Sequence, residues 1–334
     1  MNTPALTPID HPSAWYARDL APHPEQWCVT IPAPVLAEMQ GVASRMDRST
    51  VEAVTAQPVD RSQLSQTLAF IEGMEKEVMI GRGFVVLKGL PAQWDDGLLR
   101  ACYWIMINLL GRPVSQNSYG ELLCEVKDLG KKLGEARVRG YMTNEDLKFH
   151  TDRAAMVGLL CMQRAKSGGV SRISSAVTVF NHLIKERPDL VPVVAHGLNY
   201  MSVEEGGEIE VRRMPIYDLH EGVLSCRYSR NTLATAILQG APYTDAEKES
   251  LDVLDRITDD SELCLDMTLD RGDIQLVNNF TTLHARTDFQ DWPEPERRRC
   301  MARAWIATNI QRPVAAHFSD YYGVPMTLKR EAAA

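Results

Sequence analysis

The stretch Lys148-Phe149-His150-Thr151-Asp152 contains the only His-x-Asp triplet in this chain of 334 residues. In an extended strand, residues two apart point to the same face, so His150 and Asp152 can offer an imidazole and a carboxylate to one metal ion. A third candidate ligand, His284, lies far downstream in an apolar segment. Two histidines and one carboxylate can hold one face of an iron(II) ion and leave the opposite face open. Taken alone, the triplet is equally consistent with a surface pair, and an isolated histidine such as His284 is more often a core histidine than a ligand.

A basic run follows His284 in the sequence. If 299–307 is a strand, Arg299 and Arg303 lie on one of its faces, and the other face is apolar throughout. A face with two arginines lies against solvent or a polar cavity. A guanidinium in a cavity needs an anionic partner, which a carboxylate ligand would supply through a bidentate pair. The alternative is a solvated strand face, and Arg297 and Arg298 are expected at the surface.

Other residues near these motifs have weaker signals. Asn278 and Asn279 precede His284 and can bond backbone groups, orient the histidine or form a turn. His23 and Glu25 have the spacing of metal ligands, but a proline separates them in an irregular arm. The remaining histidines without a partner at ligand spacing are expected to be structural or exposed: His182, His196, His220 and His317.

The composition narrows the class of protein. Hydrophobic residues make up 45% of the chain, which suffices for one large domain or two modest ones. A net charge of −8 argues against nucleic-acid and membrane surfaces and favours a small-molecule ligand. Seven cysteines without a Cys-x-x-Cys pair argue against disulfides and structural zinc. With no signal peptide or membrane span visible, we expect a soluble cytoplasmic protein, and a homo-oligomer is left open.

The pattern of apolar residues predicts many short strands and a few flanking helices. Such a pattern favours a mainly β fold, a sandwich or barrel, over a doubly wound sheet. Residues 1–27 are expected to form an irregular arm, and 114–148 to form loops and brief strands. Helices are predicted over 62–80, 95–110, 181–186 and 245–258. Strands are predicted over 84–87, 157–161, 173–179, 264–269, 274–278 and 299–307.

Four segments together resemble the taurine dioxygenase (TauD/TfdA) and clavaminate synthase-like family of iron(II)- and 2-oxoglutarate-dependent oxygenases. They are Lys148 to Asp152, Gly168-Gly169-Val170-Ser171, Asn278 to Thr287, and Arg299-x-x-x-Arg303-Ala304-Trp305. The resemblance implies a distorted double-stranded β-helix, a jelly-roll or cupin-like core, with flanking helices. It implies one oxygenase domain over 62–310, with an N-terminal arm and first elements over 1–61 packed on the core and a tail over 311–334.

The resemblance also implies roles for individual residues. The iron(II) ligands would be His150, Asp152 and His284. Arg299 would bind the distal carboxylate of 2-oxoglutarate. Ser171 stands where the family commonly has a supporting hydroxyl, although a plain turn serine is an equal alternative. Arg303 would meet an acidic group of the substrate or the cosubstrate. Because Asp152 is present, the resemblance favours oxygen chemistry over halogenation.

The expected reaction is oxidation of an unactivated C–H bond by hydroxylation, desaturation or cyclisation, with release of succinate and CO2. The leading substrate class is an amino acid or a metabolite derived from one. Candidate pocket residues are Arg139, Tyr141, Asn144, Glu145, Tyr228 and Arg230. Two alternatives stay open: a zinc or manganese hydrolase with the same ligands, and a non-catalytic jelly-roll protein that binds or senses a small acid.

Overall fold

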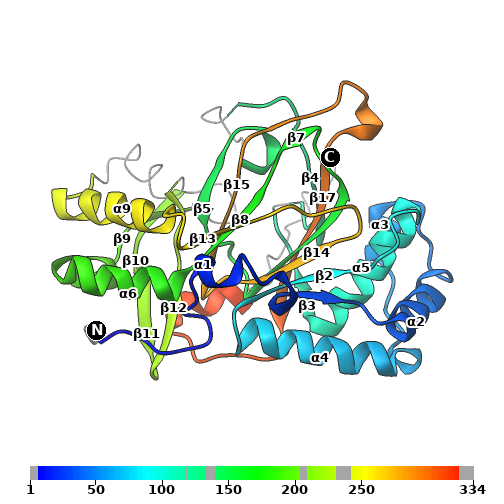
Figure 1. Ribbon diagram of the computed structural model, residues 1–334, viewed down its shortest axis with the longest axis horizontal. Helices are drawn as coiled ribbons and strands as arrows, with labels where there is room; N and C mark the ends of the chain where they lie inside the picture. Colours follow the sequence, from blue (N-terminus) through cyan, green and yellow to red (C-terminus); the bar gives the residue numbers. More distant parts are fainter. Residues whose placement is uncertain (1–6, 118, 133–139, 204–208, 231–241, 323–334) are drawn as a thin grey trace, which may run out of the picture.

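The computed structural model describes residues 7–117, 119–132, 140–203, 209–230 and 242–322. Its largest sheet has seven strands, six of which follow one another across the sheet (Figure 1). The order is β1 (Cys28–Thr30), β2 (Phe84–Lys88), β14 (Ile274–Asn278), β6 (Met156–Gln163), β17 (Cys300–Thr308) and β3 (Gly111–Val114). Strand β4 (Leu123–Val126) also pairs with β17. Only the pair of β1 with β2 is parallel, so this major sheet is built almost wholly from antiparallel strands.

A four-stranded minor sheet carries most of the chemistry-bearing motifs. Its order is β13 (Cys264–Met267), β8 (Ser171–Ser175), β15 (Thr282–Arg286) and β5 (Leu147–His150), and every pair is antiparallel. A two-stranded extension pairs β7 (Ser167–Gly168) with β16 (Phe289–Gln290). The minor sheet faces the major one, and side chains from both sheets form one buried cluster that includes Val157, Val277, Ile173 and Leu265.

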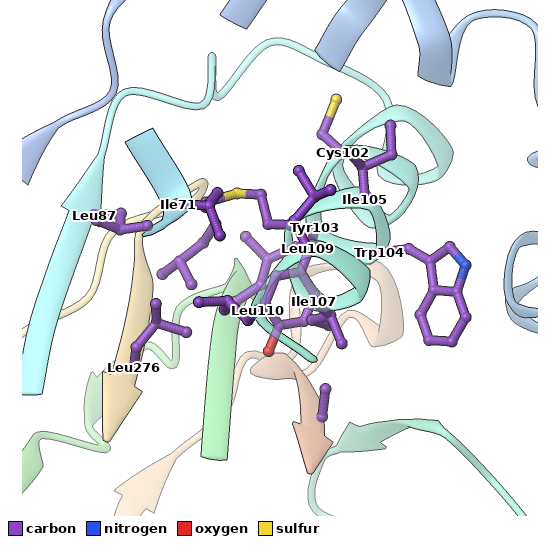
Figure 2. Close-up of a cluster of buried hydrophobic side chains, with 14 of the residues drawn as sticks. Ile71, Leu87, Cys102, Tyr103, Trp104, Ile105, Ile107, Leu109, Leu110 and Leu276 are labelled. Carbon is purple, nitrogen blue, oxygen red and sulfur yellow. The ribbon is translucent and has the colours of Figure 1, made fainter. Parts of the chain in front are cut away.

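Three helices cover the outer face of the major sheet: α2 (Ala33–Ala43), α4 (Ser65–Met79) and α5 (Asp96–Leu110) (Figure 1). Helix α5 is buried along nearly all of its length. Figure 2 shows its side chains clustered with Ile71 of α4, Leu87 of β2 and Leu276 of β14. This apolar layer fixes the major sheet from behind. The short helices α1 (Ala17–Leu20) and α3 (Val51–Thr55) lie in the N-terminal quarter of the chain.

The outer face of the minor sheet is covered by α6 (Ala176–Glu186), α7 (Val191–His196) and α9 (Asp245–Thr258). Two hairpins complete this side of the molecule: β9 (Leu198–Val203) with β10 (Ile209–Met214), and β11 (Tyr217–His220) with β12 (Val223–Cys226). The last described element is a short helical turn, η6 (Ala316–Tyr322), whose Phe318 is fully buried. None of the described helices is long and apolar enough to cross a membrane.

The expected fold class, mainly β with flanking helices, is confirmed, with two facing sheets in place of a closed barrel. The helices expected over 62–80, 95–110 and 245–258 are α4, α5 and α9. A capping box begins α9, with the Thr244 hydroxyl accepting from the Glu247 amide and the Glu247 carboxylate accepting from the Thr244 amide.

The strand predicted over 173–179 is wrong beyond Ser175. The Ser175 hydroxyl accepts a hydrogen bond from the backbone amide of Thr178 and caps α6, which begins at Ala176. The β-branched residues Val177 and Val179 favour a strand in isolation, but in the fold they face the core from a helix. The helix predicted over 181–186 is therefore the second half of α6. The arm over 1–27 also contains α1, and the sequence analysis did not predict α2.

Gly272 precedes β14 and offers a test of this packing. Its φ of +91° favours glycine, and a Cβ there would clash with the Leu90 carbonyl oxygen. We expect Gly272→Ala to lower the free energy of unfolding by at least about 1–2 kcal/mol, the cost of left-handed backbone alone. Urea unfolding measures it. Gly73→Ala is the control, because Gly73 lies on the exposed face of α4 and a Cβ there would meet nothing within 4 Å. Its free energy of unfolding should rise by about 1 kcal/mol or less. Equal stability of Gly272→Ala and the native chain would contradict the expectation.

Candidate active site

Three potential metal ligands meet on the inner side of the minor sheet. His150 ends β5, Asp152 follows it, and His284 lies on β15 directly opposite His150 in the strand register. The two imidazole rings are 4.3 Å apart between centroids. The potential ligand atoms of all three residues lie within 4.8 Å of one another, the only such group found among the described residues. The structure therefore brings together the two sequence motifs that spacing alone could not connect.

The hydrogen bonds around the cluster orient its side chains. Nδ1 of His150 lies 2.8 Å from the Lys148 carbonyl oxygen, which can only accept, so Nδ1 carries the proton and Nε2 is left with a lone pair. The backbone amide of Asp152 donates to the Asn279 side-chain oxygen over 3.0 Å. Asn279 also donates to the Ala154 carbonyl over 2.9 Å. Asn279 thus fixes the main chain on both sides of the carboxylate residue.

The charge states suit a divalent metal. Burial first, and then the nearby His284, lower the pKa of His150 to about 4, so its imidazole is neutral at neutral pH. Burial alone would raise the pKa of Asp152, but the Arg303 guanidinium and the two imidazoles bring it below its ordinary value. A neutral imidazole and an ionised carboxylate are the forms that ligate metals.

A pocket between the two sheets joins this cluster to a buried arginine. Arg299 lines the pocket and is 8% exposed. Its Nη1 has no hydrogen-bond partner, and no carboxylate pairs with its guanidinium in the described part of the chain. Burial lowers the pKa of Arg299, which is the mark of a cation without a counter-ion. A guanidinium so placed can bind an anionic group that enters the pocket.

Small residues make the space around Arg299. Gly169 has a φ of +68°, and a Cβ there would lie 3.1 Å from Nε of Arg299. The Phe289 ring lies beneath the guanidinium at 5.1 Å. Ser171 also lines the pocket, and its hydroxyl donates to the Gln275 side-chain oxygen over 3.1 Å. Gly169, between β7 and β8, therefore leaves room for the Arg299 side chain.

Two further buried arginines line the same pocket. Arg303 donates from Nε to the Gln116 side-chain oxygen over 2.7 Å, and its Nη1 lies 3.7 Å from Asp152. Arg286 donates to the carbonyl oxygens of Thr143 and Glu145, and burial together with the charge of Arg299 lowers its pKa to about 10. Arg286 thereby ties the segment before β5 to β15.

The residues predicted to contact substrate are placed differently. Asn144 is exposed and donates to the Phe289 carbonyl, while Glu145 contributes its own carbonyl to Arg286. Neither belongs to the described lining of the pocket. Arg230 forms an ion pair with Asp252. Three other positions complete this set: the Tyr228 hydroxyl bonds Asp255, while Arg139 and the side chain of Tyr141 lie outside the described residues.

Several residues that hold the site had no assigned role in the sequence analysis. They are Trp305, which donates to Asp152, Gln116 and Gln275, which accept from Arg303 and Ser171, and Arg286, which donates to the Thr143 carbonyl. The strand alternation did place Trp305 on the same face as Arg303, which was a usable signal. The remaining three become visible only when distant strands are brought together. Asn278, one of the two asparagines considered there, bonds the Val78 carbonyl in the core.

The sequence matches the family described as "Taurine catabolism dioxygenase TauD, TfdA family" over residues 53–305. The chain belongs to this family. The TauD, TfdA match covers all four strands of the minor sheet and every candidate ligand, so the chain is a 2-oxoglutarate-dependent dioxygenase. It is 30% identical over 328 residues to FR-33289 synthase of Streptomyces rubellomurinus (strain ATCC 31215), with 94% of each chain covered.

Solved structures of low sequence identity share the fold. One is an asparagine oxygenase in complex with Fe(II), 2S,3S-3-hydroxyasparagine and succinate, with a TM-score of 0.61 and 18% identity. Another is the non-heme iron oxygenase OrfP in complex with Fe and alpha-ketoglutaric acid, with a TM-score of 0.61 and 13% identity. Each comparison covers 84% of this chain and 93% of the other.

The cluster predicts a metal site that depends on both imidazoles. We expect His150→Ala and His284→Ala each to weaken Ni(II) binding by at least tenfold, because each removes one of three ligands. Calorimetric titration of the purified protein measures this. His182→Ala is the matched control, since His182 lies on α6 beside Glu186 and outside the cluster. Native affinity in both cluster variants would show that the three residues do not bind a metal together.

Proposed function

We propose that this TauD, TfdA protein is an iron(II)- and 2-oxoglutarate-dependent oxygenase that oxidises an unactivated C–H bond of an amino acid or a metabolite derived from one. The reaction would release succinate and CO2. The observation that carries the proposal is the convergence of His150, Asp152 and His284 in one pocket with Arg299, a buried cation that has no counter-ion among the described residues.

The residues divide the work of binding. His150, Asp152 and His284 would hold the iron, which together with the cosubstrate supplies the oxidising chemistry when bound. Arg299 would pair with the distal carboxylate of 2-oxoglutarate, and burial between the sheets strengthens that pair. The Ser171 hydroxyl would add a second contact at the same end of the pocket. Apolar side chains such as Leu159 and Met301 line the space between and exclude water.

Substrate selection is proposed to involve Arg303. Among the residues first considered for substrate binding, it is the one that lines the described pocket, and it lies beside the ligand Asp152. A carboxylate on the substrate would bring an anion to this guanidinium. An amino-acid substrate is further supported by two similar structures, which contain hydroxyasparagine and (3S)-hydroxy-L-Arg.

We place the enzyme in the cytoplasm, since all seven cysteines are free thiols.

Anaerobic spectroscopy and a product assay test the proposal together. Addition of Fe(II) and then 2-oxoglutarate should produce a weak visible charge-transfer band. Admission of oxygen should yield succinate, and amino acids screened singly should stimulate its formation. A hydrolase or a non-catalytic binder would give neither result. If the band is absent and His150→Ala matches the native protein in every assay, the proposed function is wrong.

Arg299→Gln should weaken binding of 2-oxoglutarate to the Ni(II)-loaded protein by at least tenfold. The expectation rests on hydrogen bonds to charged groups, which contribute about 1.5–3 kcal/mol, where 1.4 kcal/mol is a factor of ten. Calorimetry with a matched titration of Arg298→Gln provides the control, because Arg298 is exposed and bonds only nearby carbonyls. Equal affinity in the Arg299 and Arg298 variants would remove Arg299 from the cosubstrate site.

Gly169→Ala should also weaken cosubstrate binding, because its Cβ would lie 3.1 Å from Nε of Arg299 and push the guanidinium from its place. Gly222→Ala is the matched control. Gly222 has a similar positive φ of +79°, but a Cβ there would meet nothing within 4 Å. Both variants therefore carry backbone strain, and only the first disturbs the arginine. If both bind 2-oxoglutarate equally well, steric crowding at Arg299 has no effect on the cosubstrate.

A further inference from the structure

One oxygen of the Asp152 carboxylate is already engaged. The indole nitrogen of Trp305 donates to Oδ2 over 2.9 Å, and Nη1 of Arg303 lies 3.7 Å from the same oxygen. Both side chains point inward from β17, two residues apart on one face of the strand. No donor among the described residues bonds the other oxygen, Oδ1, which lies 3.9 Å from Nε2 of His150. Nε2 of His284 lies 3.7 Å from Oδ2, so each carboxylate oxygen faces one imidazole.

The carboxylate is therefore fixed from two directions. Asn279 bonds the backbone amide of Asp152 from the turn after β14, and Trp305 bonds the carboxylate from β17. Trp305 itself is firmly placed, because its backbone pairs with Val157 of β6 on one side and Val114 of β3 on the other. Its ring packs against the buried cluster between the sheets. Rotation of the carboxylate would break the indole hydrogen bond.

We propose that Trp305 is a positioning residue that, with Arg303, holds the Asp152 carboxylate in the orientation in which it meets the two imidazoles. This inference rests on the proposed function. The indole N–H donates to Oδ2 and the Arg303 guanidinium lies beside it, so the carboxylate cannot turn without disturbing both contacts. A carboxylate held in this way would be ready to ligate a metal together with His150 and His284.

Tryptophan suits this role chemically. Its indole N–H only donates, so it cannot itself ligate the metal, and it does not change protonation state in the working pH range. Histidine or aspartate in its place could compete for the metal. The proposed role therefore depends on the indole N–H and not on the ring as such. A phenyl ring keeps most of the packing but lacks the N–H, so a phenylalanine variant separates the contribution of the hydrogen bond from that of packing.

Trp305→Phe should weaken Ni(II) binding about 10–100-fold, the usual loss when a hydrogen-bond partner of a metal ligand is removed. Calorimetric titration measures it, and a thermal melt confirms folding. Trp27→Phe is the matched control: its indole also donates to a buried acceptor, the Leu20 carbonyl, at 3.0 Å, but outside the site. Native Ni(II) affinity in Trp305→Phe would overturn the proposal.

A second pair of variants separates positioning from general packing. In the Asp152→Ala background, two imidazoles remain, and imidazole alone is a good ligand for Ni(II). If Trp305 acts through the carboxylate, Asp152→Ala and the double variant Asp152→Ala/Trp305→Phe should bind Ni(II) equally. If the tryptophan change costs the same factor in both backgrounds, it acts by packing and the proposal is wrong.

Cosubstrate binding distinguishes failure of this inference from failure of the proposed function. At saturating Ni(II), Trp305→Phe should bind 2-oxoglutarate at least about threefold more weakly than the native protein. Without the indole hydrogen bond the Asp152 carboxylate is free to turn, and it can then occupy a position that 2-oxoglutarate needs. A native protein that binds neither Ni(II) nor 2-oxoglutarate would refute the proposed function itself. A native protein that binds both, with an unchanged Trp305→Phe variant, would refute only the role of Trp305.

Discussion

The register of β15 against β5 and β8 is the constraint on which the site depends. It sets His284 opposite His150 and points both imidazoles between the sheets. Because side chains alternate along a strand, a slip of one residue would turn His284 toward the outer helices and bring Leu283 inward. The register is held by that same alternation, since Leu283 and Ala285 fill the cluster beneath α6 and α9. The same strand register therefore buries these apolar residues and brings the metal-ligand candidates together.

Charge in the pocket gives the second constraint. Three buried arginines line it, Arg286, Arg299 and Arg303, beside the exposed Arg164, and Asp152 is the one acidic side chain in its described lining. Burial of cations is unfavourable unless partners are supplied. Arg286 is satisfied by backbone carbonyls and Arg303 by Gln116 near Asp152, which leaves Arg299 as the cation that an entering anion would neutralise. The arrangement prepares an anion site in advance, at a cost to stability that the surrounding apolar layers offset.

Local sequence patterns predicted the elements whose signals are local. The period of α4 and the capping box of α9 are properties of short windows, and both helices form as expected. The strand prediction for 173–179 was wrong beyond Ser175, because the helix cap formed by Ser175 outweighs the β propensity of the valines that follow. The pairing of distant histidines needed strand register, which no spacing encodes; there the family resemblance supplied what the residue pattern could not. Asn144 shows that closeness in sequence does not give position in space: it lies a few residues before His150 but outside the described lining of the pocket.

Strand β17 shows how stability and site geometry are linked. Its outward residues, Ala302, Ala304 and Ile306, pack against the helical layer dominated by α5, while Arg303 and Trp305 point into the site. Small alanines let α5 approach the sheet closely, and close packing tolerates little movement. Any shift of β17 toward or away from the helix would also carry the indole away from Asp152. The apolar layer in Figure 2 therefore does more than exclude water: it sets the depth at which the polar face of this strand meets the ligand carboxylate.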